Sequence, residues 1–169
     1  DKVKIDILVN CAGIIHGGLF QMTPVNRIRE IFNINFFSNL ELTQLVCKIM
    51  IRNKKGSIIN IASTAGLDLS KGNCAYGVSK SALIAFSKTL SKEMSDHGIR
   101  VNVVAPSLTK TDMGLSNEAE KERKLLNGKR PFKRMATPKE VSEVVTFLAS
   151  DKSIFINGQV LRVDGGNKF

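Results

Sequence analysis

Tryptophan is absent from the 169-residue sequence, tyrosine occurs once and cysteine occurs three times. The cysteines (Cys11, Cys47 and Cys74) are odd in number and lack a Cys-x-x-Cys spacing, which argues against a disulfide framework and against a metal site. We expect each to be a buried or half-buried free thiol. No apolar run approaches the length that crosses a bilayer, and the one at 5–9 is too short for a secretory signal. These absences predict a cytoplasmic protein that does not bind a membrane.

Acidic residues are scarce relative to basic ones: 15 Asp and Glu stand against 25 Lys and Arg, a formal net charge of +10. Such an excess raises the hypothesis of a nucleic-acid-binding module. The densest basic groups lie at 52–55, 121–124 and 129–134, and Phe132 is the one aromatic among them. Because base-stacking platforms need interleaved aromatics, we favour solvated basic faces over nucleic-acid binding.

Hydrophobic patterning predicts strands that alternate with helices. Short apolar runs indicate buried strands at 5–9, 57–62, 99–105 and 159–163. Apolar residues at helical spacing indicate helices at 26–51, 75–96 and 137–150, and an exposed, charged helix is expected at 115–127. Strands alternating with long helices imply an α/β fold, with a doubly wound parallel sheet covered on both faces.

Helix boundaries carry recognisable signals. The helix at 26–51 is expected to end before Gly56, which stands near a C-terminal cap position. Thr137, Pro138 and Glu140 have the spacing of an N-cap, a first helical position and a capping box. The buried stripe of the 26–51 helix, on which Asn35 also falls, is expected to contain Ile28, Ile31, Phe32, Leu40, Leu42, Leu45, Val46 and Ile49.

Tyr76 and Lys80 are four residues apart near the start of a predicted helix, so both side chains point to one face. A tyrosine hydroxyl titrates near pH 10, and an ammonium held beside it lowers that pKa toward the range that a general acid or base needs. Taken alone, such a pair is more often a bland surface pair.

Two polar residues accompany the pair. Ser63 directly follows a buried strand, where its hydroxyl could hold a substrate oxygen or simply cap a turn. Asn35 lies on the buried stripe of a helix, and a buried amide is costly unless it is hydrogen bonded, so it is either a core asparagine bonded to backbone or part of a site. In a parallel sheet, ligands bind beyond the carboxyl ends of the strands, which points to residues 10–13, 62–66 and 106–113.

Several separated motifs resemble those of the short-chain dehydrogenase/reductase family. Residues 10–13 (Asn-Cys-Ala-Gly) are similar to its Asn-Asn-Ala-Gly signature, and residues 101–106 leading to 111–113, and 158–166, match two further signatures. The order and spacing of the family's catalytic tetrad are matched by Asn35, Ser63, Tyr76 and Lys80. The resemblance covers residues 3–166 and implies a Rossmann-like oxidoreductase that uses NADP or NAD.

The resemblance also implies roles for individual residues. Tyr76 would exchange a proton with the carbonyl or alcohol oxygen, Ser63 would hold that oxygen, and Lys80 would lower the tyrosine pKa and bind the ribose. The backbone of Asn35 would hold a water that links Lys80 to solvent. The implied cofactor-binding positions are Asn10, Cys11, Ala12, Gly13, Tyr76, Lys80, Pro106, Thr109 and Thr111.

The sequence departs from the family pattern at several points. Cys11 replaces an asparagine, Thr109 replaces an aliphatic residue, and Ser107 replaces a glycine, which would reshape the loop if that glycine needs a positive φ. None of the thirteen glycines forms the Thr-Gly-x-x-x-Gly-x-Gly loop that binds pyrophosphate in the family. We therefore expect residues 1–169 to be a single partial domain with the fourth to seventh strands, inactive alone and lacking the phosphate-binding region.

Within the family, the sequence resembles 3-oxoacyl-acyl-carrier-protein reductases. The resemblance implies a small-molecule or acyl-carrier-bound carbonyl substrate and a homodimer or homotetramer formed through the helices at 26–51 and 75–96. Lys54 matches a basic position that these reductases use for the carrier, and His97 stands where another would be arginine. A sugar or polyol dehydrogenase and a catalytically dead fragment remain alternatives; the choice of NAD or NADP and the substrate stay open.

Overall fold

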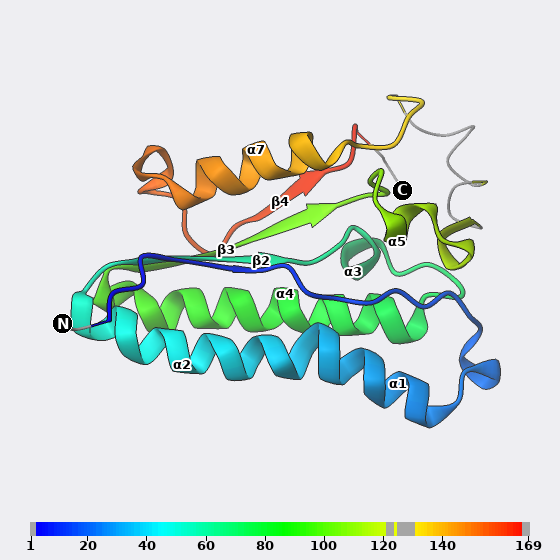
Figure 1. Cartoon of the computed structure of the whole chain (residues 1–169), viewed down its shortest axis with the longest axis horizontal. Coiled ribbons are helices and arrows are strands. Elements are labelled where there is room, and N and C mark those ends of the chain that lie inside the picture. The colour runs from blue at the N-terminus through cyan, green and yellow to red at the C-terminus, as the bar shows by residue number, and fades with distance from the viewer. Residues whose placement is uncertain (1–2, 121–123, 125–130, 167–169) are drawn as a thin grey trace.

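The computed structural model describes residues 3–120, 124 and 131–166. Its four strands form one parallel sheet in the order β1-β2-β3-β4 (Figure 1). The strands are β1 (Ile7–Asn10), β2 (Gly56–Ile61), β3 (Ile99–Pro106) and β4 (Val160–Val163). The predicted parallel α/β sheet is confirmed, and the predicted strands differ from the observed ones by two residues or fewer at each end.

Helices cover both faces of this sheet. On one face α2 (Ser38–Asn53) and α4 (Cys74–Met94) lie side by side, and on the other lies α7 (Pro138–Ala149) (Figure 1). The shorter helices are α1 (Val25–Phe32), α3 (Ala65–Asp68) and α5 (Asp112–Leu115), with 3-10 turns at 20–22, 95–97, 117–119 and 151–153. Among the described residues, no helix is both long and apolar enough to cross a membrane.

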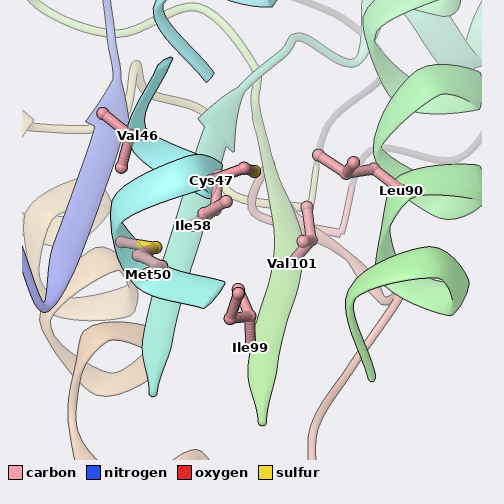
Figure 2. Packing of buried hydrophobic residues seen from close by; sticks show 7 residues of the cluster. All are labelled: Val46, Cys47, Met50, Ile58, Leu90, Ile99 and Val101. Atoms are coloured by element: carbon pink, nitrogen blue, oxygen red, sulfur yellow. The ribbon is translucent and has the colours of Figure 1, made fainter. Parts of the chain in front are cut away.

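Successive residues of β2 point to opposite faces and build two separate clusters. Ile58 packs against Val46, Cys47 and Met50 of α2 and against Leu90 of α4 (Figure 2). Its neighbour Ile59 packs with Val104 and Leu148 under α7. This alternation follows from the two-residue period of a strand, and burial on both faces explains why β2 reads as a continuous apolar run.

The helix predicted at 26–51 is a helical stretch interrupted by a π-helical turn at Asn33–Phe37. This turn lengthens one helical repeat and therefore shifts the phase of the buried stripe in α2. The prediction that Leu42 and Leu45 are buried is wrong: they are 47% and 60% exposed. The buried positions of α2 are Asn39, Thr43, Val46, Cys47 and Met50.

The helix ends agree with the sequence in part. The Thr137 capping box is confirmed, because its hydroxyl accepts from Glu140 N and the Glu140 carboxylate accepts from Thr137 N. At the end of α2 it is Lys54, not Gly56, that takes a left-handed conformation, with φ of 50°. Lys54 donates its N–H to the carbonyl of Ile51, and Gly56 already belongs to β2.

Two further expectations need correction. The helix expected at 115–127 does not begin there, because α5 ends at Leu115 and Ser116 is extended; most of the remainder lies outside the described residues. Of the cysteines, Cys47 is buried as expected, whereas Cys11 and Cys74 are exposed. Cys11 directly follows β1, and Cys74 is the first residue of α4. At such element ends, apolar neighbours in the sequence do not predict whether a side chain is buried.

Candidate active site

A cavity of about 960 Å³ lies at the carboxyl ends of the strands, where a parallel sheet binds ligands. Three of the four predicted tetrad residues, Ser63, Tyr76 and Lys80, contribute to its lining. The predicted cofactor positions that also line it are Cys11, Gly13, Pro106, Thr109 and Thr111. Residues up to 100 positions apart in the sequence are thus brought to a single cavity.

The first two turns of α4 place Tyr76 and Lys80 on its buried side. Tyr76 is 7% exposed and Lys80 is 3% exposed. The Lys80 ammonium donates a hydrogen bond of 2.9 Å to the carbonyl of Ile61, the last residue of β2. Burial lowers the pKa of Lys80 to about 8, and the electrostatic effect of nearby Cys11 acts in the opposite direction. Lys80 therefore gains or loses its proton close to neutral pH.

Gly13 lies directly against this ammonium. A Cβ added to Gly13 would be 3.2 Å from Lys80 Nζ and 3.3 Å from Asn35 Oδ1. Such distances are tight for any side chain, so glycine allows the main chain to approach the lysine this closely. The loop after β1 thus packs directly on the Lys80 and Asn35 side chains.

Asn35 is fully buried in the π-helical turn and lies behind the cavity lining. Its Oδ1 accepts from Ile14 N at 2.8 Å, and its Nδ2 donates to Ile14 O at 3.0 Å and to Ser79 Oγ at 3.1 Å. The side chain thus joins the loop after β1 to α4. This is the bonding expected of a core asparagine, and the water-holding role of its backbone stays a prediction.

Ser63 follows β2, where it caps a turn and also faces the cavity. Its Oγ accepts from Ala65 N at 3.1 Å, which is the turn-capping alternative, while the residue also lines the cavity. A hydroxyl oxygen that accepts one bond can still donate its own hydrogen to another partner. The two interpretations of Ser63 are therefore compatible.

The short helix α3 fixes Ser63 relative to α4. A Cβ on Gly66 would lie 2.8 Å from the Lys80 carbonyl carbon, so the absence of a side chain there permits close packing of the two helices. Ser81 Oγ donates to Gly66 O at 2.6 Å across the same contact. At the other end, Thr64 N donates to Pro106 O at 3.0 Å. Ser63, Tyr76 and Lys80 consequently share one rigid support.

The segment after β3 forms another wall of the cavity. Thr109 Oγ1 donates to Ser107 O at 2.9 Å, and Thr111 Oγ1 accepts from Gly114 N at 3.2 Å as the N-cap of α5. Lys110 N donates to Ala136 O, which ties the segment to the start of α7. In the described part of the chain only Lys54 and Leu69 are non-glycine residues with positive φ, so Ser107 needs no glycine-like backbone. The expected reshaping of this loop has no cause in backbone strain.

Asn10 and Ala12 are not in the cavity lining, contrary to the expectation that residues 10–13 all line the cleft. Asn10 is 3% exposed, and its Nδ2 donates to Thr43 Oγ1 at 2.8 Å and to Asn60 Oδ1 at 2.7 Å. Asn60 in turn donates to Ser87 Oγ at 2.7 Å. The side chain at this position therefore serves the interior between the sheet and its helices.

Sequence reasoning missed several residues of the cavity wall. Asp68, Ser70 and Asn73 line it between Ser63 and Tyr76, and Val141 and Val145 of α7 line it from the other face. The aliphatic residues of α7 carry no signal that separates a cavity wall from a core. Asp68 did offer one signal, since it is the one acidic residue between the predicted site residues Ser63 and Tyr76.

A doubly wound parallel sheet with a serine, a tyrosine and a lysine at one cavity defines the class of short-chain dehydrogenases and reductases. The family model described as "Enoyl-(Acyl carrier protein) reductase" matches residues 2–168, and the chain belongs to this family. The resemblance in the sequence is thereby confirmed.

Among curated proteins, the chain is similar to a 3-oxoacyl-[acyl-carrier-protein] reductase FabG of Thermotoga maritima, with 37% identity over 163 residues. It is also similar to carbonyl reductase family member 4 of Xenopus tropicalis, with 40% identity over 163 residues. Each alignment covers 96% of this chain and 66% of the relative. The chain thus spans just under two thirds of the length of these relatives.

Solved structures with a bound nicotinamide cofactor have the same fold. ElxO with NADP bound superposes with a TM-score of 0.87 at 31% identity, covering 96% of this chain and 66% of that one. A 4-hydroxyisoleucine dehydrogenase mutant complexed with NADH and succinate superposes with a TM-score of 0.91 at 28% identity, covering 99% and 70%. Both similarities extend over nearly all of this chain.

Proposed function

We propose that this chain carries the catalytic residues of an NADP- or NAD-dependent oxidoreductase that transfers hydride reversibly between nicotinamide and a carbonyl or alcohol. The observation that carries the proposal is the convergence of Tyr76, Ser63 and a buried Lys80 on one cavity. The pKa of Lys80 is lowered to about 8 there, and perturbed titration in a cleft is typical of a catalytic group. Membership of a family of reductases supports the same conclusion.

The cavity at the carboxyl ends of the strands is the feature that fits a nicotinamide cofactor. Its volume of about 960 Å³ leaves room for a ribose and its hydroxyls beside the donors and small residues of its lining (Lys80, Cys11 and Gly13). When bound, the cofactor supplies or accepts the hydride, which no side chain can do. The hydroxyls of Thr109 and Thr111 bond to local backbone. A contact with the carboxamide would therefore come from a main-chain group or from the Thr109 hydroxyl oxygen, which can still accept.

Proton transfer is the task of this chain's own residues. Tyr76 donates its phenolic proton to the carbonyl oxygen during reduction and recovers it in the reverse direction. The ammonium of Lys80, on the same helix face, favours the phenolate and so lowers the cost of that donation. Ser63 Oγ, with its oxygen already bonded to Ala65 N, donates its hydrogen to the same carbonyl oxygen.

A 3-oxoacyl group on an acyl carrier protein is the substrate that we favour. Relatives with that named activity support it, as does the net charge of +10, since an acidic carrier is attracted to a basic surface. Lys54 and His97 are neighbours, because a Cβ on the adjoining Gly98 would lie 2.7 Å from Lys54 O. They lie at the amino ends of β2 and β3, whereas the cavity lies at the carboxyl ends.

This separation has a consequence for assembly. The six residues of β2 span about 20 Å, so a carrier docked at Lys54 would serve the cavity of another copy more readily than that of its own chain. Exposed apolar side chains on the helical layer (Phe37, Leu42, Leu45 and Val78) support a homodimer or homotetramer formed through α2 and α4. We place this assembly in the cytoplasm.

Two alternatives stay open. The similarity to a carbonyl reductase favours a small free carbonyl or alcohol, such as that of a sugar or a polyol, over a carrier-bound one. An inactive fragment is the other: residues 1–169 correspond to about two thirds of the length of the relatives, which supports a partial Rossmann-like domain.

The proposal is tested by intact mass, cofactor titration and turnover. NADPH and NADH are titrated under fluorescence, and their oxidation is followed with a 3-oxobutanoyl thioester or a free ketone. Reduction of NADP+ and NAD+ is followed with a polyol. Saturable binding of one cofactor with turnover of a carbonyl supports the proposal, and the preferred substrate chooses between carrier-bound and free carbonyls. Binding without turnover of any member of the panel, or no binding, would contradict it.

A further inference from the structure

Arg162 is a charged residue in the otherwise aliphatic strand β4 (Val-Leu-Arg-Val). Its Nη1 and Nη2 donate to Asp68 Oδ1 and Oδ2 at 2.8 and 2.7 Å, and its Nε donates to Asp164 Oδ2 at 2.7 Å. The two carboxylates raise the pKa of the Arg162 guanidinium above its usual range. Bidentate pairing fixes geometry as well as charge, which separates this pair from an ordinary surface ion pair.

This fork joins distant parts of the chain. Asp68 is the last residue of α3 and lines the cavity, whereas Arg162 is 94 residues later and is not in the lining. The Asp68 and Asp164 side chains are only 12% and 9% exposed, and that of Arg162 is 33% exposed. The contact is therefore partly withdrawn from solvent and less screened than a fully exposed pair.

The residue after Asp68 explains why an anchor is needed. Leu69 has φ of 40° and ψ of 74°, a left-handed conformation that a leucine adopts reluctantly. Its side chain is 62% exposed, so burial does not hold it in place. We attribute the left-handed conformation of Leu69 to Asp68, the preceding residue, which its ion pair with Arg162 holds in place.

From this turn the chain continues along the cavity to the proton donor. Ser70 and Asn73 line the cavity, with Asn73 Nδ2 donating to Ser70 Oγ at 3.2 Å, and α4 begins at the next residue. The start of α3 is already fixed against α4 and β3. Residues 68–73, which we call the rim segment, are therefore anchored at their start by Arg162 and at their end by α4.

We propose that Arg162 is a positioning residue that, through Asp68, holds the rim segment in the shape that binds the carbonyl substrate. The inference rests on the proposed oxidoreductase function, because it assigns the rim segment to the substrate side of that site. Arg162 acts on substrate binding and leaves cofactor binding and the Tyr76–Lys80 pair unchanged.

The kinetic test uses Arg162→Gln and Asp68→Asn in the full-length protein, with a 3-oxobutanoyl thioester as substrate. Each variant should raise the KM for the thioester about tenfold, and the KM for the nicotinamide cofactor and the pH profile of kcat should not change. The double variant should be no worse than either single one, because both remove the same contact. Arg162→Lys, which keeps the charge without the fork, should recover part of the loss and serves if Arg162→Gln does not fold.

Arg134→Gln is the matched control. Arg134 forms another bidentate pair, with Glu140 at the start of α7, and neither residue lines the cavity. If this variant raises the KM for the thioester as much as Arg162→Gln does, the effect is general and the proposal is overturned. An unchanged KM in Arg162→Gln overturns it as well.

Hydrogen exchange gives a readout that does not depend on catalysis. Amides of the rim segment should exchange about tenfold faster in Arg162→Gln than in wild type, and in Arg134→Gln they should not. If wild type turns over no carbonyl, the proposed function fails, and exchange alone then decides whether Arg162 holds the rim. Faster exchange confined to 68–73 supports that role, and unchanged exchange there refutes it.

Discussion

The two faces of the sheet are built from different chemistry. Under α7 the interior consists mainly of aliphatic side chains such as Ile59, Val104 and Leu148. Its buried polar residues (Ser57, Asn102 and Ser153) bond the backbone at the end of that helix and in the segment that follows it. Under α2 and α4, an aliphatic cluster gives way near the carboxyl ends of the strands to the buried polar residues Asn10, Asn35, Asn60, Ser87 and Lys80. Burial of polar groups is costly, and the second group includes the predicted site residues Asn35 and Lys80, so the face under α2 and α4 is the one that supports the chemistry.

If this contrast is correct, damage under α7 should cost stability and spare the chemistry. Leu148→Ala removes a fully buried side chain and should lower the free energy of unfolding by about 3 kcal/mol. The kcat of the molecules that remain folded should be unchanged. Urea denaturation and active-site titration measure the two effects.

The neighbouring Phe147→Ala is the control for this substitution. Phe147 is 38% exposed. Phe147→Ala should therefore lower the free energy of unfolding less than Leu148→Ala does, although it removes a larger side chain. A loss of kcat in folded Leu148→Ala would show that the α7 face also shapes the chemistry.

Lys80→Met should have the opposite effect: more stability and less activity. The folded-state pKa of Lys80 is about 8, below its ordinary value of 10.5, so the folded protein disfavours the charged lysine. That penalty is full below pH 8 and disappears as pH rises toward 10.5, and it amounts to about 3 kcal/mol. The variant should be more stable than wild type at pH 7, with kcat/KM at least about tenfold lower.

Denaturation of both proteins between pH 7 and pH 10.5 checks this prediction. The stability difference should shrink through that range as wild-type Lys80 loses its proton. A variant that is less stable than wild type at pH 7 would mean that the bond from Lys80 to Ile61 outweighs the cost of burying the charge.

The polar network between Asn10 and Asn60 should show a smaller and mutual effect. Their side chains are joined by a 2.7 Å hydrogen bond between adjacent strands. In a double-mutant cycle, Asn10→Ala and Asn60→Ala should be coupled by about 1 kcal/mol, because each leaves the other with a buried unsatisfied group. Additive free energies of unfolding would show that the two side chains act independently.

The smallest expected effect is at the start of α7. Thr137→Ala removes the oxygen that accepts from Glu140 N and should cost about 1 kcal/mol of stability. Thr137→Ser keeps that oxygen and should cost much less. Thermal unfolding of the three proteins distinguishes loss of the cap from a general sensitivity of this position.

Local patterns predicted much of this architecture. The alternation of short apolar runs and helical stripes predicted the four strands and their parallel pairing, and the spacing of Tyr76 and Lys80 placed both on one helix face at the cavity. These features depend on residues that are close together in the sequence, within one or two helical turns, and can therefore be predicted from a single sequence. The same holds for the capping box at Thr137.

Features that depend on distant contacts were not predictable. The π-helical turn around Asn35 shifted the buried stripe of α2, and no residue type marks such a turn in the sequence. Asn10 belongs to a signature that suggested a cleft, yet its direction is set by Thr43 and Asn60, which are 33 and 50 residues away. The fork between Arg162 and Asp68 is likewise invisible until the strands are aligned.

Tyr76 is the proposed proton donor of this site. The most direct test is the kcat of Tyr76→Phe in the full-length protein, with saturating cofactor and a 3-oxobutanoyl thioester. Thr89→Ala, on the exposed side of the same helix, serves as the control. We predict a kcat at least about a hundredfold below wild type for Tyr76→Phe, with unchanged cofactor affinity and a normal control. A Tyr76→Phe kcat within a factor of a few of wild type would contradict the account.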